Sequence, residues 1–195
     1  MGRARHRQRD GLPWPLQGFW IFIGLVLTVG GQPPPTLCVA ALVGGQALAI
    51  QSSWQVGAVL FTACMGGKTV GAIAQIGYLA LGLSGFGVFW EGGGLDYVRS
   101  PSFGYLLGFV PGAWICGHQV YRRAPTLENL AFGCFCGWVT IHLCGAAYLG
   151  LSHLTRWGEV GPLLVRYSLN IAPDQLVMIC AVTLLAWLLR KVLMY

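Results

Sequence analysis

Charged residues are absent from one long stretch near the start of the chain, GLPWPLQGFWIFIGLVLTVGGQPPPTLCVAALVGGQALAIQSSWQVGAVLFTACMGG (residues 11–67). About 20 apolar residues cross the roughly 30 Å hydrocarbon core of a bilayer as a helix, so this stretch is long enough for two crossings. Pro33, Pro34 and Pro35 interrupt the stretch and predict the turn between the two crossings. The stretch therefore predicts a membrane protein.

The composition supports this prediction. Of the 195 residues, 55% are apolar and 9% are charged, whereas about 25% of the residues of a soluble domain are charged. The 29 glycines have no three-residue period, which excludes collagen and suits closely packed membrane helices. The net charge of +6 comes from 12 basic residues spread over a chain that is otherwise almost free of charge, so we expect no nucleic acid as a partner.

Three more charge-free runs, 69–90, 100–121 and 129–155, are each long enough for one span. A last span is predicted from about Pro173 to Leu193, with Arg190 and Lys191 snorkelling to the interface. The runs are continuously apolar and do not alternate, which favours helices over a barrel. We therefore predict an all-α bundle of six transmembrane helices. Residues 36–50 are predicted to be re-entrant or interfacial, before a second span at about Trp54–Met65.

Basic residues are unequally divided between the two sides of such a bundle. One side would carry Arg3, Arg5, Arg7, Arg9, Lys68, Arg122, Arg123, Arg190 and Lys191, and the other only Arg99, Arg156 and Arg166. The positive-inside rule then places both termini in the cytoplasm. We predict a multi-pass protein of the cell membrane, with a basic cytoplasmic tail (1–13), a six-helix domain (14–195), and outward loops near residues 90–100 and 151–172.

Residues 1–29 have a second interpretation, because a basic start followed by an apolar run is also typical of a secretory signal peptide. No small-residue cleavage site lies cleanly before the proline run, and removing the first span would spoil the charge asymmetry. We therefore favour a retained first helix.

Several chemical motifs are incomplete. Gly66-Gly67-Lys68-Thr69 ends like a phosphate-binding loop, but the motif needs a glycine where this chain has Thr62. We interpret it as a short turn between two membrane helices, with Lys68 as a topology anchor. The seven cysteines form no CxxC pair and are interpreted as small buried residues. His142 lies in the middle of a span, where it either bonds a neighbouring helix or relays protons. No nucleophile, base and orienting group occur together, so we predict no enzyme, no catalytic residues and no metal site.

Residues 81–117 are the most informative for a binding site. Gly92, Gly93 and Gly94 would let backbone N–H groups approach a ligand, and varied polar side chains surround them at Glu91, Asp96, Arg99, Ser102 and Tyr105. An ordinary outer loop with turn glycines is the alternative. Asp174, at the start of the last span on the same outer side, is the second candidate, although an acid in a first helical turn is also explained by the helix dipole alone.

The chain resembles the BioY family, the biotin-specific substrate-binding (S) component of energy-coupling factor vitamin transporters. The resemblance covers roughly Gln51–Leu189. It rests on Gln51-Ser52, GGKTVGAIAQIGYLALGLSGFGVF (Gly66–Phe89), Gly92-Gly93-Gly94, PSFGYLLGF (Pro101–Phe109) and APD (Ala172–Asp174). The family signature Gly-Pro-Thr-Gly-Gly-Tyr appears here in altered form as Ser100-Pro101-Ser102-Phe103-Gly104-Tyr105.

This resemblance implies a six-helix receptor that captures biotin from outside the cell and delivers it to an ATP-driven module. Its expected partners are a transmembrane coupling subunit and two ATP-binding subunits, with membrane lipid around the helices. Biotin is the cargo, and no cofactor is implied. Association with further copies of the chain stays open.

The expected substrate-binding residues are Gln51, Trp90, Glu91, Gly92, Gly93, Gly94, Arg99, Ser102, Tyr105 and Asp174. We expect Asp174 to accept a ureido N–H and Arg99 to meet the valerate carboxylate. Tyr105, Ser102 or the glycine amides would meet the ureido oxygen, and Trp90, Phe89 and Tyr97 would cover the bicycle.

Two departures from the family pattern stand out. Val177 replaces the lysine that the family commonly has, and the first helix lacks the alanine pattern expected for docking to a shared coupling subunit. The alternatives are an S component for another small vitamin and a structural or assembly membrane protein without a ligand.

Overall fold

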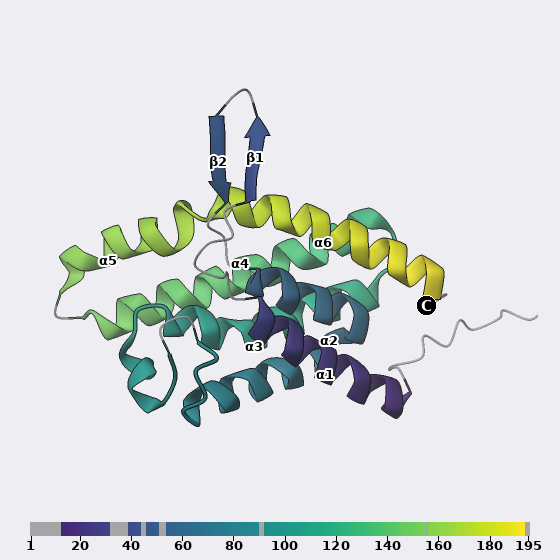
Figure 1. Ribbon diagram of the computed structural model, residues 1–195, viewed down its shortest axis with the longest axis horizontal. Helices are drawn as coiled ribbons and strands as arrows, with labels where there is room; N and C mark the ends of the chain where they lie inside the picture. The colour runs from purple at the N-terminus through teal and green to yellow at the C-terminus, as the bar shows by residue number, and fades with distance from the viewer. Residues whose placement is uncertain are drawn as a thin grey trace, which may run out of the picture.

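The computed structural model describes residues 13–31, 39–43, 46–50, 54–89, 92–154 and 156–193, which are mainly helical (Figure 1). The helices are α1 (Trp14–Gly30), α2 (Gln55–Leu83), α3 (Phe103–Arg122), α4 (Leu127–Ser152), α5 (Trp157–Leu164) and α6 (Ala172–Leu193), with a 3₁₀ turn η1 (Leu95–Arg99) and a π-helical segment η2 (Val165–Leu169). The prediction of a helical fold is confirmed for these elements.

One short hairpin departs from the all-α prediction. Strand β1 (Val39–Val43) pairs antiparallel with β2 (Gln46–Ile50), in the region expected to be re-entrant or interfacial. The sequence joins the two apolar runs by Gly44-Gly45, and a Gly-Gly pair between such runs favours a hairpin over a helix.

Helix α2 folds back on itself at Gly67. This glycine has φ 84° and ψ −177°, a backbone conformation in which the helix cannot continue. Gln55 Nε2 donates a hydrogen bond to the Tyr78 hydroxyl over 2.9 Å, whereas a straight helix would hold these residues about 35 Å apart. The predicted turn beside Lys68 is therefore confirmed, and α2 supplies two antiparallel arms, residues 55–66 and 68–83.

The helices alternate in direction along the chain. The close contacts that set these directions join Gly31 to Gln55, Gly24 to Thr62, Gly71 to Ala113 and Gly117 to Lys68. As a result, the Gly67 turn, the connection between α3 and α4, and the last turn of α6 lie at one end, here called the basic end. Residues 84–102 and the corner between α4 and α5 lie at the other, the loop end (Figure 1).

Glycines bring α3 and α4 into close contact. A Cβ atom on Gly108 would lie 2.9 Å from the Ile141 carbonyl oxygen, and one on Gly137 would lie 2.8 Å from the Gly112 carbonyl oxygen. Real Cβ atoms do not approach backbone oxygens so closely, so these positions accept only glycine. Small residues at such spacing allow the backbones of membrane helices to pack tightly.

The last span begins earlier than predicted. Residues 151–172 were expected to form an outward loop, but α5 and η2 occupy most of this region, and the apolar helical run extends from Trp157 to Leu193. Arg156, Glu159 and Arg166 suggest a loop in the sequence, yet their side chains are exposed. The helix therefore continues past these charges without burying them.

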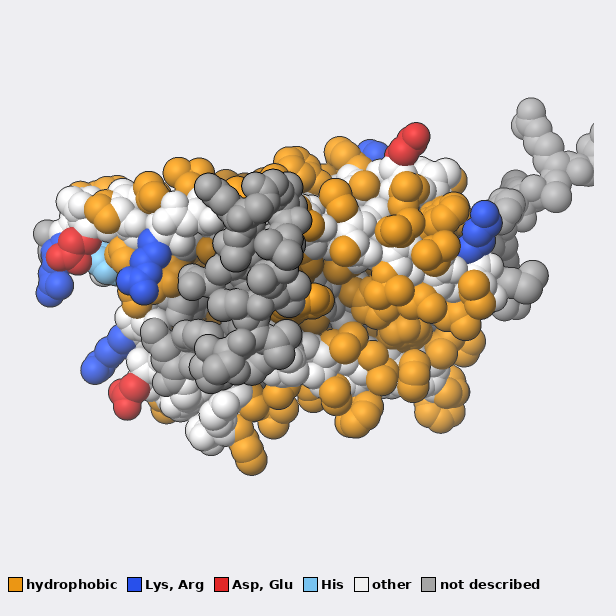
Figure 2. All heavy atoms as spheres, turned by 45° about the horizontal axis from the view of Figure 1, so that its top comes forward, with side chains coloured by type: hydrophobic (Ala, Val, Ile, Leu, Met, Phe, Trp, Pro, Cys, Tyr) orange, Lys and Arg blue, Asp and Glu red, His pale blue; other side chains and the backbone are white. Residues whose placement is uncertain are grey.

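The surface of the bundle suits a membrane. By length and composition, three stretches of the described residues are sufficient to cross a bilayer, namely α2, α4 and Trp157–Leu193, and α1 is a shorter apolar helix. Large apolar side chains such as Phe22, Ile76 and Phe132 are exposed. Figure 2 shows hydrophobic side chains over much of the visible face and charged ones mainly toward its two ends. An apolar surface of this extent indicates contact with lipid.

Candidate functional site

A chain of hydrogen bonds crosses the interior between α3, α4, η2 and α6. The Tyr105 hydroxyl lies 2.8 Å from Ser168 Oγ, which lies 3.0 Å from His142 Nδ1. On the other side of the imidazole, His142 Nε2 lies 2.8 Å from Gln175 Oε1, which also accepts a 2.6 Å bond from Trp138 Nε1. We call these five residues the polar network.

The roles of donor and acceptor in the polar network follow from its chemistry. A glutamine oxygen only accepts hydrogen bonds. His142 Nε2 therefore carries a hydrogen and donates a hydrogen bond to Gln175 Oε1. Nδ1 of the same neutral imidazole then accepts from Ser168, whose oxygen in turn accepts from Tyr105. Each atom in this chain of bonds has a partner, and such pairing allows a buried polar group to be tolerated in an apolar bundle.

Local sequence explains how the polar network assembles. Trp138 and His142 are four residues apart on α4 and therefore share a face. Gly145, one turn further, lies directly against the Tyr105 ring, so the absence of a side chain there makes room for the tyrosine. The Tyr105 ring meets His142 edge to face, at 5.6 Å between centroids, and lies 6.0 Å from Tyr167.

Asp174 lies deeper in the bundle than the sequence indicated. It is half-buried in the first turn of α6, next to Gln175, which is only 4% exposed. Because Gln175 bonds His142 in the middle of α4, Asp174 lies beside the polar network. α5 and η2 precede Asp174 in the same apolar run.

Aromatic rings cover the interior at the loop end. Phe89 lies 5.4 Å from Tyr78 and 4.7 Å from Tyr97, and Tyr97 lies 6.4 Å from Phe103. The Tyr148 hydroxyl of α4 donates to the Val98 carbonyl oxygen, which fastens the 3₁₀ turn to the bundle. These contacts pack the loop against the helices at this end of the bundle, and we call the aromatic rings the aromatic cover.

The loop glycines make backbone hydrogen bonds to other residues of the loop and to the end of α2. Gly92 has φ 116° and pairs with Phe89 through two hydrogen bonds of 2.9 and 3.0 Å. Gly94 has φ 96°, and its N–H donates to the Gly82 carbonyl oxygen over 2.8 Å. A Cβ on Gly93 would lie 2.9 Å from that same oxygen. Two of the three amides expected to meet a ligand are thus bonded to the protein itself.

The other predicted site residues are separated by the structure. Ser102 lies just before α3, where its Oγ is 3.0 Å from the Tyr97 hydroxyl and 2.9 Å from Ser100 Oγ. Arg99 is exposed at the end of η1. Gln51, Trp90 and Glu91 lie outside the described residues.

A second group of polar side chains lies between α1 and the two arms of α2. Gln55 Nε2 donates to the Tyr78 hydroxyl over 2.9 Å, Tyr78 donates to the Val88 carbonyl oxygen over 3.0 Å, and Gln75 Nε2 donates to Thr28 Oγ1 over 3.2 Å. Gln75 Oε1 is buried and makes no hydrogen bond within the described part of the chain. This group ties the loop end to the helices beneath it.

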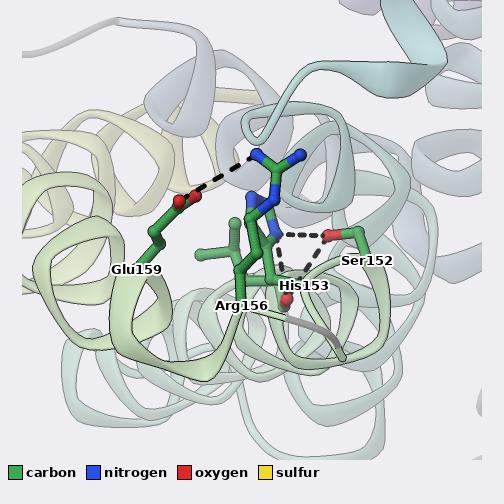
Figure 3. Close-up of polar contacts among 5 residues, drawn as sticks. Ser152, His153, Arg156 and Glu159 are labelled. Atoms are coloured by element: carbon green, nitrogen blue, oxygen red, sulfur yellow. Dashed lines mark hydrogen bonds and ion pairs between the residues drawn. The ribbon is translucent and has the colours of Figure 1, made fainter.

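The corner between α4 and α5 carries exposed polar contacts (Figure 3). Ser152 Oγ lies 2.9 Å from His153 Nδ1, and Arg156 lies 3.9 Å from Glu159. Arg156 and Glu159 are 72% and 54% exposed, so water screens their interaction. These residues close a helix corner and do not form a binding site.

Sequence reasoning missed Ser168, Gln175 and Trp138 as members of a site. The spacing of Trp138 and His142 was the one available signal, because both lie on the same face of an apolar helix. Ser168 lies in a segment expected to be a loop, where a serine carries no signal.

Comparisons with known proteins agree with this architecture. A model of the BioY family matches residues 35–194. The chain is 33% identical over 178 residues to a Cyanophora paradoxa protein described as an uncharacterized 21.2 kDa protein in the psbX-ycf33 intergenic region, covering 89% of this chain and 94% of that protein. It is 33% identical over 127 residues to a Lysinibacillus sphaericus protein named "Probable biotin transporter BioY", covering 58% and 65%.

A solved structure is similar in fold. The crystal structure of the S-component for biotin from an ECF-type ABC transporter matches with a TM-score of 0.68 and 18% identity, over 91% of this chain and 90% of that one.

Proposed function

This chain belongs to the BioY family, and on that premise we infer that it is the biotin-binding component of an energy-coupling factor transporter. It is a transport component and not an enzyme, and biotin is its cargo. The observation that carries this proposal is the polar network beneath the aromatic cover. It offers hydrogen-bonding groups and ring faces at one place inside an apolar bundle.

Biotin presents groups that match this place. It has two ureido N–H donors, one ureido carbonyl, an apolar bicycle with a sulfur, and a valerate carboxylate. We propose that Asp174 accepts a ureido N–H, because a charge-assisted hydrogen bond in a partly dry site is stronger than a neutral one. Tyr105 is the proposed partner of the ureido oxygen, and its single O–H would then turn from Ser168, to which it donates in this structure, to the ligand.

The structure changes which aromatic residues we propose to contact the biotin bicycle. Phe89 and Tyr97 are buried against each other beneath the loop, so they support the cover more than they offer a free face. Tyr167 and Trp138 lie beside Tyr105 and His142, and we propose that these rings contact the bicycle. Trp90 remains a proposed cover residue, and Gln51 and Glu91 remain proposed contacts of biotin.

The valerate chain would extend toward the loop end. Arg99 is exposed there on the 3₁₀ turn and is the proposed partner of the carboxylate. Ser102 and the Gly92–Gly94 segment are proposed to position this region, since they already hold the loop together. A carboxylate at the mouth of the site stays partly hydrated, which lowers the cost of binding.

The loss of the family lysine at position 177 does not redirect the proposal to another vitamin. Val177 is 65% exposed, whereas its neighbour Gln175 is buried in the polar network. A lysine at position 177 would therefore point toward the outside of this bundle.

Topology is proposed from the arrangement of the helices and the charges. We propose six spans, which are α1, the two arms of α2, α3, α4 and the run Trp157–Leu193. The domain is proposed to extend over residues 14–195 after a basic tail (1–13). Lys68, Arg122 and Arg190 lie at the basic end, so the positive-inside rule places this end, with both termini, in the cytoplasm. The loop end then faces outward in the cell membrane.

The proposed partners are a transmembrane coupling subunit and two ATP-binding subunits. They are proposed from the family alone, and membrane lipid is proposed from the exposed apolar surface. No nucleic acid is expected.

Binding of labelled biotin to the purified protein tests the proposal. We expect saturable binding to the full chain in detergent, and Asp174→Asn should weaken it by about 1.5 to 3 kcal/mol. Glu159→Gln is the matched control, because Glu159 is an exposed acid in the first turn of α5. Absence of saturable biotin binding to the folded wild-type chain would contradict the function. An unchanged affinity of Asp174→Asn would contradict the role of the acid.

A further inference from the structure

Three cysteines from three different helices meet near the basic end of the bundle. Cys64 lies in the first arm of α2, Cys116 in α3 and Cys134 in α4, and all three are 0% exposed. Cys64 Sγ lies 3.4 Å from Cys134 Sγ and 3.9 Å from Cys116 Sγ, and the three sulfur atoms lie within 4.8 Å of one another. We call this group the thiol cluster.

These distances match the spacing of three sulfur ligands around one metal ion. With metal–sulfur bonds of about 2.3 Å, three sulfurs in a trigonal plane are about 4.0 Å apart, and about 3.8 Å apart in a tetrahedron. The distances of 3.4 and 3.9 Å from Cys64 Sγ lie close to these values, and all three sulfur atoms lie within 4.8 Å of one another.

A buried cation adjoins the thiol cluster. Arg190 is only 7% exposed, its Nη1 donates to the Cys64 carbonyl oxygen over 3.4 Å, and its guanidinium lies 4.6 Å from the Tyr121 ring centroid. The expectation that Arg190 snorkels to the interface is therefore wrong, because the side chain turns into the bundle. A positive charge here would stabilise thiolates, which carry negative charge when they bind a metal.

We propose that Cys64, Cys116 and Cys134 bind one monovalent copper ion. Thiolates are soft ligands that select Cu(I), zinc and iron–sulfur clusters, and structural zinc sites almost always use four ligands. No fourth Cys, His, Asp or Glu joins the group among the described residues. Binding would release the thiol protons that remain, form three copper–sulfur bonds and leave the oxidation state of copper unchanged.

The position of the thiol cluster suits this role and separates it from the polar network. Cys64 lies about one helical turn before Gly67, and Cys116 about two turns before the end of α3, so the path from the basic end is short. If this end faces the cytoplasm, the thiols stay reduced. An ion held by three helices would fasten α2, α3 and α4 together, independently of biotin.

Copper binding to the purified full-length protein tests the proposal. The reduced protein would be titrated with Cu(I) under anaerobic conditions against a chromophoric Cu(I) chelator, with X-ray absorption on the product. We expect one Cu(I) per chain with sulfur ligands at about 2.3 Å. Cys134→Ser should lose this copper. Cys136→Ser, a half-buried cysteine on the same helix outside the cluster, should keep it.

A second variant distinguishes loss of the copper site from loss of the folded structure. Cys116→Ala keeps a small apolar side chain, and it should also lose copper while labelled biotin still binds. Equal copper in the wild type, Cys134→Ser and Cys116→Ala would overturn the proposal, as would absence of copper from the wild type at all chelator strengths. Binding of zinc but not Cu(I) would overturn the choice of metal.

Discussion

The two faces of α4 differ in the contacts that they make with neighbouring helices. Toward α3, the Cβ positions of Gly133 and Gly137 lie 3.3 and 2.8 Å from the carbonyl oxygens of Cys116 and Gly112, so the two helix backbones come close together at these glycines. Toward η2 and α6, Trp138 and His142 meet a serine and a glutamine through hydrogen bonds. One face sets the distance between helices, and the other provides groups that a ligand can use. The difference implies that stability and binding can be changed separately.

The largest effect is expected at the glycine face. A Leu side chain in Gly137→Leu would begin 2.8 Å from the Gly112 carbonyl oxygen and 2.7 Å from Leu60 Cδ2, so α3 and α4 must separate. We expect a loss of stability of about 3 kcal/mol, measured as a lower thermal unfolding midpoint in detergent. Gly150→Leu on the same helix is the control, since nothing lies within 4 Å of its Cβ position. Equal midpoints for the two variants would contradict the distinction between the faces.

A smaller effect, now on binding, is expected at the polar face. His142→Leu removes the link between Ser168 and Gln175, which then keep only their bonds to Tyr105 and Trp138. Loss of such a buried link costs about 1 to 3 kcal/mol. Biotin affinity should fall by at least tenfold in a labelled-biotin assay. His118→Leu is the control, because His118 stacks on Trp114, outside the polar network. Wild-type affinity in His142→Leu would show that the polar network serves structure alone.

Removal of one hydroxyl should have a still smaller effect. Ser168→Ala deletes the link between Tyr105 and His142, which a neutral hydrogen bond stabilises by about 1 kcal/mol. We expect biotin affinity to fall about fivefold. In Ser84→Ala, a hydroxyl bonded within its own helix is removed, and affinity should stay at the wild-type value. A larger loss in Ser84→Ala than in Ser168→Ala would place the site elsewhere.

The smallest effect is expected at the exposed corner of α4 and α5. Arg156 and Glu159 are largely exposed and 3.9 Å apart, and such pairs contribute about 0 to 1 kcal/mol. Arg156→Gln should therefore leave biotin affinity unchanged and shift the unfolding midpoint only slightly. A tenfold loss of binding in this variant would mean that the corner takes part in capture.

The sequence predicted much of the fold because charges mark the ends of membrane helices. The run between Arg99 and Arg122 became α3, and the predicted turn at Lys68 became the fold in α2 at Gly67. The same logic failed for α5 and η2, where exposed charges interrupt the run without ending the helix. It also failed for Arg190, which the last helix buries.

The candidate site was less accessible to sequence reasoning. Tyr105 and Asp174 were expected from the resemblance, and the structure places Tyr105 in the polar network and Asp174 beside it. Ser168 and the thiol cluster depend on which helices become neighbours. Cys64, Cys116 and Cys134 are far apart in the sequence and have no motif spacing, so only packing of three helices brings them together.

The central claim is that biotin enters from the loop end and reaches the polar network. Labelling of Ser168→Cys in intact cells with a membrane-impermeant thiol reagent tests it, with the native cysteines as background. We predict labelling from outside the cell that biotin prevents. Labelling that occurs only when the reagent is admitted to the cytoplasm, or that biotin leaves unchanged, would contradict this account.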